Sequence, residues 1–199
     1  MRHLIVVFAL VILGFQANGQ LYMAQNGEVS FFSKTPLEDI DALNKQVGSI
    51  INADNNEVAV QMRVTNFVFP NKLMQEHFNE NYMDSYQYPK ATFKGNLDGF
   101  SMANLKTSTT FDLNGVLAIK GLEKNIQTSV TVRQQDNRMF ISGVFFVSPE
   151  DFDITIPSIV RDKIAKQQGL ETIPRDVWKL LLTKQQFDVM WNGATERAF

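Results

Sequence analysis

Few side chains in this sequence could do covalent or metal chemistry. Cysteine is absent, and the two histidines are His3 and His77. Without cysteine there is no thiol nucleophile, disulfide or thiolate metal site. Because His3 lies in a segment that we expect to be removed, the mature chain keeps one histidine, which cannot build the usual two- or three-histidine metal site. A Ser-His-Asp arrangement could use only His77, and the sequence has no Gly-x-Ser-x-Gly motif that would carry the serine nucleophile.

A cluster of acidic residues is the other candidate for chemistry. Glu150, Asp151 and Asp153 could form a calcium loop or a pair of catalytic carboxylates. However, the spacing and the glycine of an EF-hand loop are missing. We therefore interpret the cluster as a solvated turn next to Phe152 and expect the protein not to be an enzyme. Carboxylate pairs assembled from distant strands stay open, because one sequence does not reveal them.

The overall charge argues against nucleic acid as a partner. Lysine plus arginine number 19 and aspartate plus glutamate 21, giving a net charge of −2 and a pI near 5.7. Proteins that bind nucleic acid usually carry a strong basic excess that neutralises phosphates. The 16 phenylalanines, against two tryptophans and four tyrosines, indicate a large interior with few polar groups.

Residues 1–19 have the pattern of a secretory signal peptide. Arg2 and His3 give a short cationic start, residues 4–15 form an apolar run of 12, and Ala17 and Gly19 are small residues at the positions that precede cleavage. The alternative is an uncleaved anchor, but 12 residues fall short of the roughly 20 that span a bilayer. No later stretch approaches that length. We therefore expect an exported protein, periplasmic or secreted, without a transmembrane segment.

The elements that would position these side chains are mostly strands. Val58, Val60, Met62 and Val64 alternate with more polar residues, which is typical of a strand with one buried face. Six further segments favour strands: residues 29–33, 91–97, 107–113, 116–120, 126–133 and 139–147. Asn114–Gly115 predicts a tight hairpin turn, and residues 121–124 and 135–137 are weaker turn candidates. Such spacing indicates an antiparallel sandwich or barrel.

Three segments have helical spacing of their apolar residues. Residues 71–85 carry a stripe that includes Met74 and Phe78, and we expect this helix to lie across one end of a barrel. Residues 35–47, with Ile40 and Val47 in register, and residues 158–167 are shorter candidates. No repeat or linker divides the chain, so about 180 mature residues form roughly one domain.

Three segments, in order, resemble the YceI-like polyisoprenoid-binding family. Residues 67–95, FVFPNKLMQEHFNENYMDSYQYPKATFKG, are similar to its signature of an aromatic strand end, a helix with a histidine, and Tyr-Pro before a strand ending in Phe-x-Gly. Residues 115–126, GVLAIKGLEKNI, resemble its hairpin, and residues 145–159, FFVSPEDFDITIPSI, resemble its closing strand. The resemblance covers about residues 28–166.

The resemblance implies a fold and a ligand. The fold would be all-β with short helices, an antiparallel lipocalin-like barrel of about eight strands around an apolar tunnel. The ligand would be a polyisoprenoid, a quinone or another long amphiphile, and no cofactor would be required. We assign the barrel to residues 20–167. Barrels of eight strands are wide enough to be filled by side chains or to hold one small ligand.

Alternation along the expected strands assigns the residues that would line the tunnel. They are the apolar residues Val60, Met62, Val64, Phe67, Phe69, Met74, Phe78, Phe93, Leu97, Phe111, Leu117, Ile119, Phe140, Val144, Phe146 and Phe152. The face of the last strand is ambiguous, because Phe145 and Phe146 are both apolar. Each of these residues could equally be ordinary core. At the barrel mouth, His77, Lys72 and Lys90 could contact a ligand head group, or His77 could bond to a neighbouring loop.

Residues 168–199 depart from the family, which would end in a closing strand rich in valine and isoleucine. One alternative is a displaced closing strand over residues 187–191 that follows an inserted helix at about residues 176–184. The other is a missing strand and an open barrel edge, which would invite pairing with another chain. Trp178 and Trp191 could cover the gap or contact a partner. The partner could be a second copy of the chain in a homodimer, or another molecule that the tail binds.

Three functions of different classes follow. The first is an exported carrier of an isoprenoid lipid in the barrel. The second is a stress- or envelope-associated interaction protein with a solid barrel and no cargo. The third is an enzyme that uses the tunnel as its substrate site, which would need polar groups clustered inside it.

Overall fold

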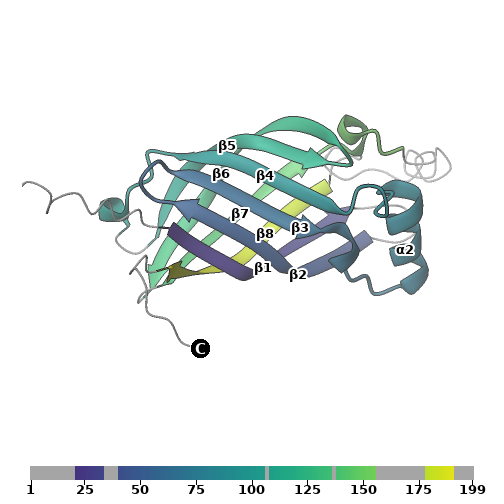
Figure 1. Cartoon of the computed structure of the whole chain (residues 1–199), viewed down its shortest axis with the longest axis horizontal. Coiled ribbons are helices and arrows are strands. Elements are labelled where there is room, and N and C mark those ends of the chain that lie inside the picture. The colour runs from purple at the N-terminus through teal and green to yellow at the C-terminus, as the bar shows by residue number, and fades with distance from the viewer. Residues whose placement is uncertain (1–20, 34–39, 106–107, 136–137, 156–177, 191–199) are drawn as a thin grey trace, which may run out of the picture.

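Eight antiparallel strands form a closed barrel in chain order, with each strand beside the next and the last beside the first (Figure 1). The computed structural model describes residues 21–33, 40–105, 108–135, 138–155 and, as backbone only, 178–190. The strands are β1 Leu21–Ser33, β2 Ile40–Asn52, β3 Glu57–Arg63, β4 Lys90–Asp98, β5 Thr109–Ile119, β6 Leu122–Gln135, β7 Arg138–Val147 and β8 Trp178–Met190. This confirms the predicted lipocalin-like barrel.

Short helices lie at the two ends of the barrel (Figure 1). After β3 come the 3-10 turn η1 (Val64–Asn66), the helix α2 (Lys72–His77) and the π-helical turn η2 (Phe78–Tyr82). The turn η4 (Pro149–Phe152) lies at the same end, and η3 (Met102–Asn104) lies at the other.

The helix predicted over residues 71–85 is confirmed in its location. It begins after Asn71, whose side chain accepts hydrogen bonds from the backbone N–H groups of Leu73 and Met74, as expected of an N-cap residue.

The helix predicted over residues 35–47 is wrong for its described part, because residues 40–47 belong to strand β2. The inward positions of β2 include Asn44 and Ser49, whereas Leu43 is only partly buried and Ile50 is exposed. Polar inward residues hide the period-two pattern and leave apolar residues at helical spacing. Pairing with both β1 and β3 decides the outcome, since tertiary context overrides local pattern. Residues 35–39 lie outside the described residues.

The hairpin turn predicted at Asn114–Gly115 is also wrong. Both residues lie within the continuous strand β5, which replaces the two strands expected there. The turn instead falls at Lys120 and Gly121, with φ of +49° and +77°. It overlaps the weaker candidate at residues 121–124.

The other predicted strands are confirmed in location, with different ends. β3 ends at Arg63, one residue before the predicted end, and β1 starts at Leu21 and not near Val29. Gln135 pairs with Arg138 where β6 turns into β7, and residues 136–137 lie outside the described residues.

The C-terminal segment supplies the closing strand. β8 pairs antiparallel with β1 and with β7, and Leu180 is the backbone register partner of Phe31 in β1 and of Phe145 in β7. Of the two alternatives for this segment, the open barrel edge is therefore wrong. So is the inserted helix over its described part, residues 178–184, which are strand. The signal peptide and the helix predicted at residues 158–167 lie outside the described residues.

Candidate functional site

The interior of the barrel is built by the alternation that the sequence displays. In β3, Val58, Val60 and Met62 are buried, and the residues between them are exposed. In β4, Ala91, Phe93 and Leu97 are buried in the same way. Because successive side chains of a strand point to opposite faces, each strand contributes one apolar row to the interior.

Most of the predicted wall residues meet in this interior. Twelve of them are at most 9% exposed and belong to one core cluster: Val60, Met62, Val64, Phe67, Phe69, Phe78, Phe93, Leu97, Phe111, Leu117, Ile119 and Phe152. Met74 is partly buried and packs against the cluster. Their burial agrees with a tunnel wall and with an ordinary core alike.

Three predicted wall residues point outward. Val144 is 37% and Phe146 53% exposed, and Phe140 lies under the guanidinium group of Arg133, at 4.9 Å from its ring centre. The inward residues of β7 are Met139, Ile141, Phe145 and Val147. Both faces of β7 carry apolar residues, so alternation alone could not choose between them, and the pairing with β8 shifts register between Ile141 and Gly143.

Sequence reasoning missed several interior residues. They are buried apolar side chains of β1, β2, β6 and the loop after β4: Tyr22, Ala24, Val29, Phe31, Val47, Ile51, Phe100, Leu105, Val130 and Val132. Val130 and Val132 alternate with polar residues in β6, which is a signal that could have found them. The interior positions of β2 had no such signal, because they include a serine and an asparagine.

Four phenylalanine rings fill the end of the barrel beneath α2. Phe31 stacks on Phe78 with ring centres 5.2 Å apart, and Phe69 lies 4.9 Å from Phe78. Phe67 meets Phe31 and Phe78 edge to face, at 5.4 Å and 5.9 Å. Such pairs add stability beyond the area that they bury. These four residues are called the aromatic cluster below.

A smaller aromatic pair fills the opposite end. The rings of Phe100 and Phe111 meet edge to face with centres 5.4 Å apart. Leu105, next to η3, is 7% exposed and belongs to the same core. The interior therefore runs between two aromatic ends.

The interior has few polar groups. The buried polar residues that the structure describes are Asn44, Ser49 and Ser85, and none of its described Asp, Glu, Lys, Arg or His residues is buried. Tyr22 is 5% exposed, and its burial raises the pKa of its phenol above the usual value near 10. An interior of this kind favours an apolar ligand, because an unpaired charge would lose its hydration.

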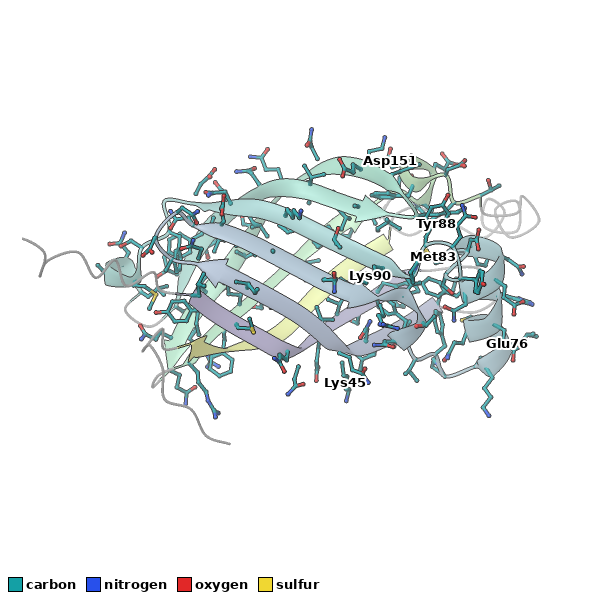
Figure 2. All side chains as sticks on the ribbon, viewed as in Figure 1. Lys45, Glu76, Met83, Tyr88, Lys90 and Asp151 are labelled. Atoms are coloured by element: carbon teal, nitrogen blue, oxygen red, sulfur yellow. The ribbon has the colours of Figure 1, made fainter. Side chains whose placement is uncertain are left out.

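The predicted head-group residues lie on the surface at the α2 end. Lys72 and His77 are the first and last residues of α2, and Lys90 begins β4. All three are exposed. Figure 2 shows Lys90 on the barrel wall, apart from α2, where Glu76 points away from the barrel. The structure does not bring the three together, and their contact with a head group stays a prediction.

The acidic cluster forms a surface turn at η4. Asp151 is paired with Lys124 at 3.3 Å, and both side chains are about half exposed. Lys120 donates a 2.9 Å hydrogen bond to the backbone carbonyl of Asp153. Among the described residues, no group of three or more Asp, Glu, His or Cys could hold a metal ion. These contacts hold η4 against β6 and the β5–β6 turn, and Phe152 of η4 is buried in the core.

A separate apolar hollow lies on the outer wall. It has a volume of about 330 Å³ and is lined by three consecutive residues from each of β1, β2, β3 and β4. Its lining includes residues of both faces of these strands, among them the exposed Ile50 and the buried Val60 and Phe93. Among the described residues, none from the opposite wall of the barrel lines it. The hollow is therefore confined to the wall formed by these four strands.

The helices of the structure give one further result. Within the described part of the chain, none has both the length and the apolar character needed to cross a membrane.

Comparison with known proteins gives a family match. The model of the YceI-like domain matches residues 15–171. No curated protein matches the chain.

Solved structures share the fold at low sequence identity. A polyisoprenoid binding domain from Saccharophagus degradans, implicated in plant cell wall breakdown, superposes with a TM-score of 0.69 at 12% identity, over 86% of this chain and 99% of that one. BcnA from Burkholderia cenocepacia gives 0.63 at 18% identity, over 81% and 95%. The YCEI protein of Campylobacter jejuni gives 0.52 at 12% identity, over 83% and 90%.

Proposed function

The chain belongs to the YceI-like domain family, and from this premise we propose that it binds a polyisoprenoid or a similar long amphiphile inside its barrel. The observation that carries the proposal is the apolar inner face of the described strands, where no ionisable side chain other than Tyr22 is buried. The polyisoprenoid binding domain from Saccharophagus degradans shares this fold. A chain of isoprene units needs apolar contact area and no hydrogen bonds.

Apolar contact is sufficient for useful affinity. Each buried methylene contributes about 0.8 kcal/mol, so a few isoprene units contribute roughly 10 kcal/mol. Association costs about 4–15 kcal/mol. Chains of more than a few units therefore reach micromolar affinity without a polar contact to the head group.

Binding requires the interior to open. The inward side chains are at most 9% exposed, so a lipid must displace them from one another. Met62 and Met74 suit this, because the thioether side chain is flexible and repacks at low cost. The ligand would replace contacts between protein side chains with contacts to its own methyl groups.

The same close packing favours a second function. A barrel whose interior is filled by its own side chains would be a solid scaffold, and its role would be to contact another protein. The observation behind this alternative is the near-complete burial of residues such as Leu97, Leu117 and Met139, at 0–1% exposed.

We propose further that the protein acts as an exported carrier and not as an enzyme. The cationic start, the apolar run and the small residues before residue 20 support export. The exposure of His77 and of the acidic cluster supports a binding role, because these side chains face solvent and not the interior. Intact mass measurement of protein from fractionated cells tests export: a mass without residues 1–19 in the periplasm or medium supports it, and the full-length mass in the cytoplasm contradicts it.

Native mass spectrometry tests the binding function. The protein is purified from a bacterial host, its intact mass is measured without denaturation, and bound molecules are extracted with organic solvent. An added mass that extracts as an isoprenoid supports the carrier. A protein that carries no added mass and also fails to bind added prenyl alcohols and quinones contradicts the carrier and favours the solid scaffold.

A further inference from the structure

Two glycines face each other on the inner wall of the barrel. Gly95 in β4 is the register partner of Gly115 in β5, and both occupy inward positions, between the buried Phe93 and Leu97 of β4 and between Leu113 and Leu117 of β5. This place is about midway between the aromatic cluster and the Phe100–Phe111 pair. The wall there has no side chains of its own.

The ring of Phe93 occupies the space that the two missing side chains leave. A Cβ atom at Gly95 would lie 2.8 Å from Cζ of Phe93, and one at Gly115 would lie 2.5 Å from the same atom. Both distances are shorter than real Cβ contacts, so any larger residue would displace the ring. The same Cβ atoms would lie even closer to the backbone carbonyl oxygens of Asn114 and Lys94, so the two strands would also have to move apart. The backbones are also close, because the Cβ at Gly95 would lie 2.9 Å from Cα of Gly115.

The two glycines therefore hold Phe93 against the wall. The ring leans along β4 and covers Gly95 and Gly115, as aromatic rings do over glycines in sheets. A side chain at either position would turn the ring away from the wall, and the free direction is toward the barrel axis. A lipid chain that occupies both halves of the interior must pass the Phe93 ring.

We infer that Phe93, held against the wall by Gly95 and Gly115, sets the length of the apolar chain that the barrel accepts. This inference rests on the proposed lipid binding. With the ring on the wall, a long chain extends from one half of the interior into the other. With the ring turned inward, the interior is divided, and only a chain short enough for one half binds at full strength.

The test compares two neutral prenyl alcohols, geranylgeraniol and the much longer decaprenol, with the full-length wild type and the variants Gly115→Ala, Phe93→Leu and Gly115→Ala/Phe93→Leu. Affinities are measured on protein whose circular dichroism spectrum matches the wild type. Gly115→Ala should weaken decaprenol binding by about tenfold or more and leave geranylgeraniol binding unchanged. The double variant should restore decaprenol binding, because the smaller leucine no longer blocks the passage.

The control is Phe146→Leu, the same substitution on the outer face, where the side chain is 53% exposed; it should bind both alcohols like the wild type. The inference is overturned if Gly115→Ala binds both alcohols like the wild type, or if the double variant does not recover decaprenol. If Gly115→Ala does not fold, Phe93→Leu alone decides: its preference for decaprenol over geranylgeraniol should rise, and an unchanged preference overturns the inference. A wild type that binds neither alcohol overturns the proposed function itself, and the inference with it.

Discussion

The side-chain amide of Asn44 donates a 2.9 Å hydrogen bond to the backbone carbonyl of Arg63. Its carboxamide oxygen accepts a second bond, also 2.9 Å, from the backbone N–H of Gln46. Asn44 is fully buried. The second bond lies within β2, and the first bond joins β2 to Arg63, the last residue of β3. The chain leaves the sheet at that point for η1 and α2, so Asn44 fixes the end of the barrel that the helix covers.

Replacing Asn44 with alanine should therefore destabilise the fold. The variant leaves the Arg63 carbonyl and the Gln46 N–H without their partner, and a buried unsatisfied group costs about 1–3 kcal/mol. Asn66→Ala is the control, because it removes an exposed side-chain bond to Gln46 and should cost about 0.5 kcal/mol or less. Urea denaturation measures both, and equal losses would show that Asn44 does not have this role.

The turn between β5 and β6 should be sensitive to any side chain at residue 121. Gly121 has φ of +77°, and a Cβ there would lie 2.9 Å from Cε1 of Tyr88. Gly99→Ala has the same left-handed strain, of about 1–2 kcal/mol, but meets nothing within 4 Å. Gly121→Ala should lower the free energy of unfolding more than Gly99→Ala does. A smaller loss at residue 121 would mean that the Tyr88 ring moves freely.

The aromatic cluster should contribute strongly to stability. Phe78 touches the rings of Phe31, Phe67 and Phe69, and truncation of such a residue to alanine costs about 3–5 kcal/mol. Phe146→Ala, on the exposed outer face, should change stability by about 0.5 kcal/mol or less. Thermal and urea unfolding of the two variants compare them directly. Similar small losses would contradict a packed end beneath α2.

Stability at high pH should depend on Tyr22. Burial raises the pKa of its phenol in the folded protein above about 10, so the unfolded chain loses this proton first as the pH rises. Below about pH 10 the folded and the unfolded chain both keep the phenol proton, so its titration does not affect the free energy of unfolding. As the pH rises from there through the folded-state pKa, the free energy of unfolding falls. The difference in unfolding free energy between wild type and Tyr22→Phe should be constant at neutral pH and shift in favour of Tyr22→Phe above about pH 10. A difference that stays constant across this range would contradict the raised pKa.

The family resemblance predicted the barrel, and alternation predicted most of its inner face where one apolar row alternates with polar residues. Val58, Val60 and Met62 are the clearest case, because both their spacing and their polar neighbours agree. Residues 40–47 of β2 were predicted as part of a helix because the inward position at Asn44 is polar, and the role of Asn44 depends on a partner in another strand. The outward position of Phe146 could not be predicted, because Phe145 beside it is equally apolar.

Glycines were the second source of error. Asn114–Gly115 has the composition of a turn, but Gly115 is needed for the close approach to Gly95 and the Phe93 ring. A local pattern does not distinguish a glycine that permits a turn from one that makes room for a distant side chain. The closing strand β8 was expected only over residues 187–191 as one alternative, because pairing with β1 and β7 over its full length depends on the whole barrel.

Photo-crosslinking with a prenyl alcohol that carries a diazirine at its tail tests the central claim most directly. The labelled lipid is bound to the purified protein and irradiated, and the modified residues are identified by tandem mass spectrometry. Lipid inside the barrel should label inward residues such as Met62 and Leu117, which do not line the outer hollow, and unlabelled decaprenol should compete. Labelling confined to Met23 and Ile50 of the outer hollow, or labelling that decaprenol does not reduce, would contradict lipid binding in the barrel interior.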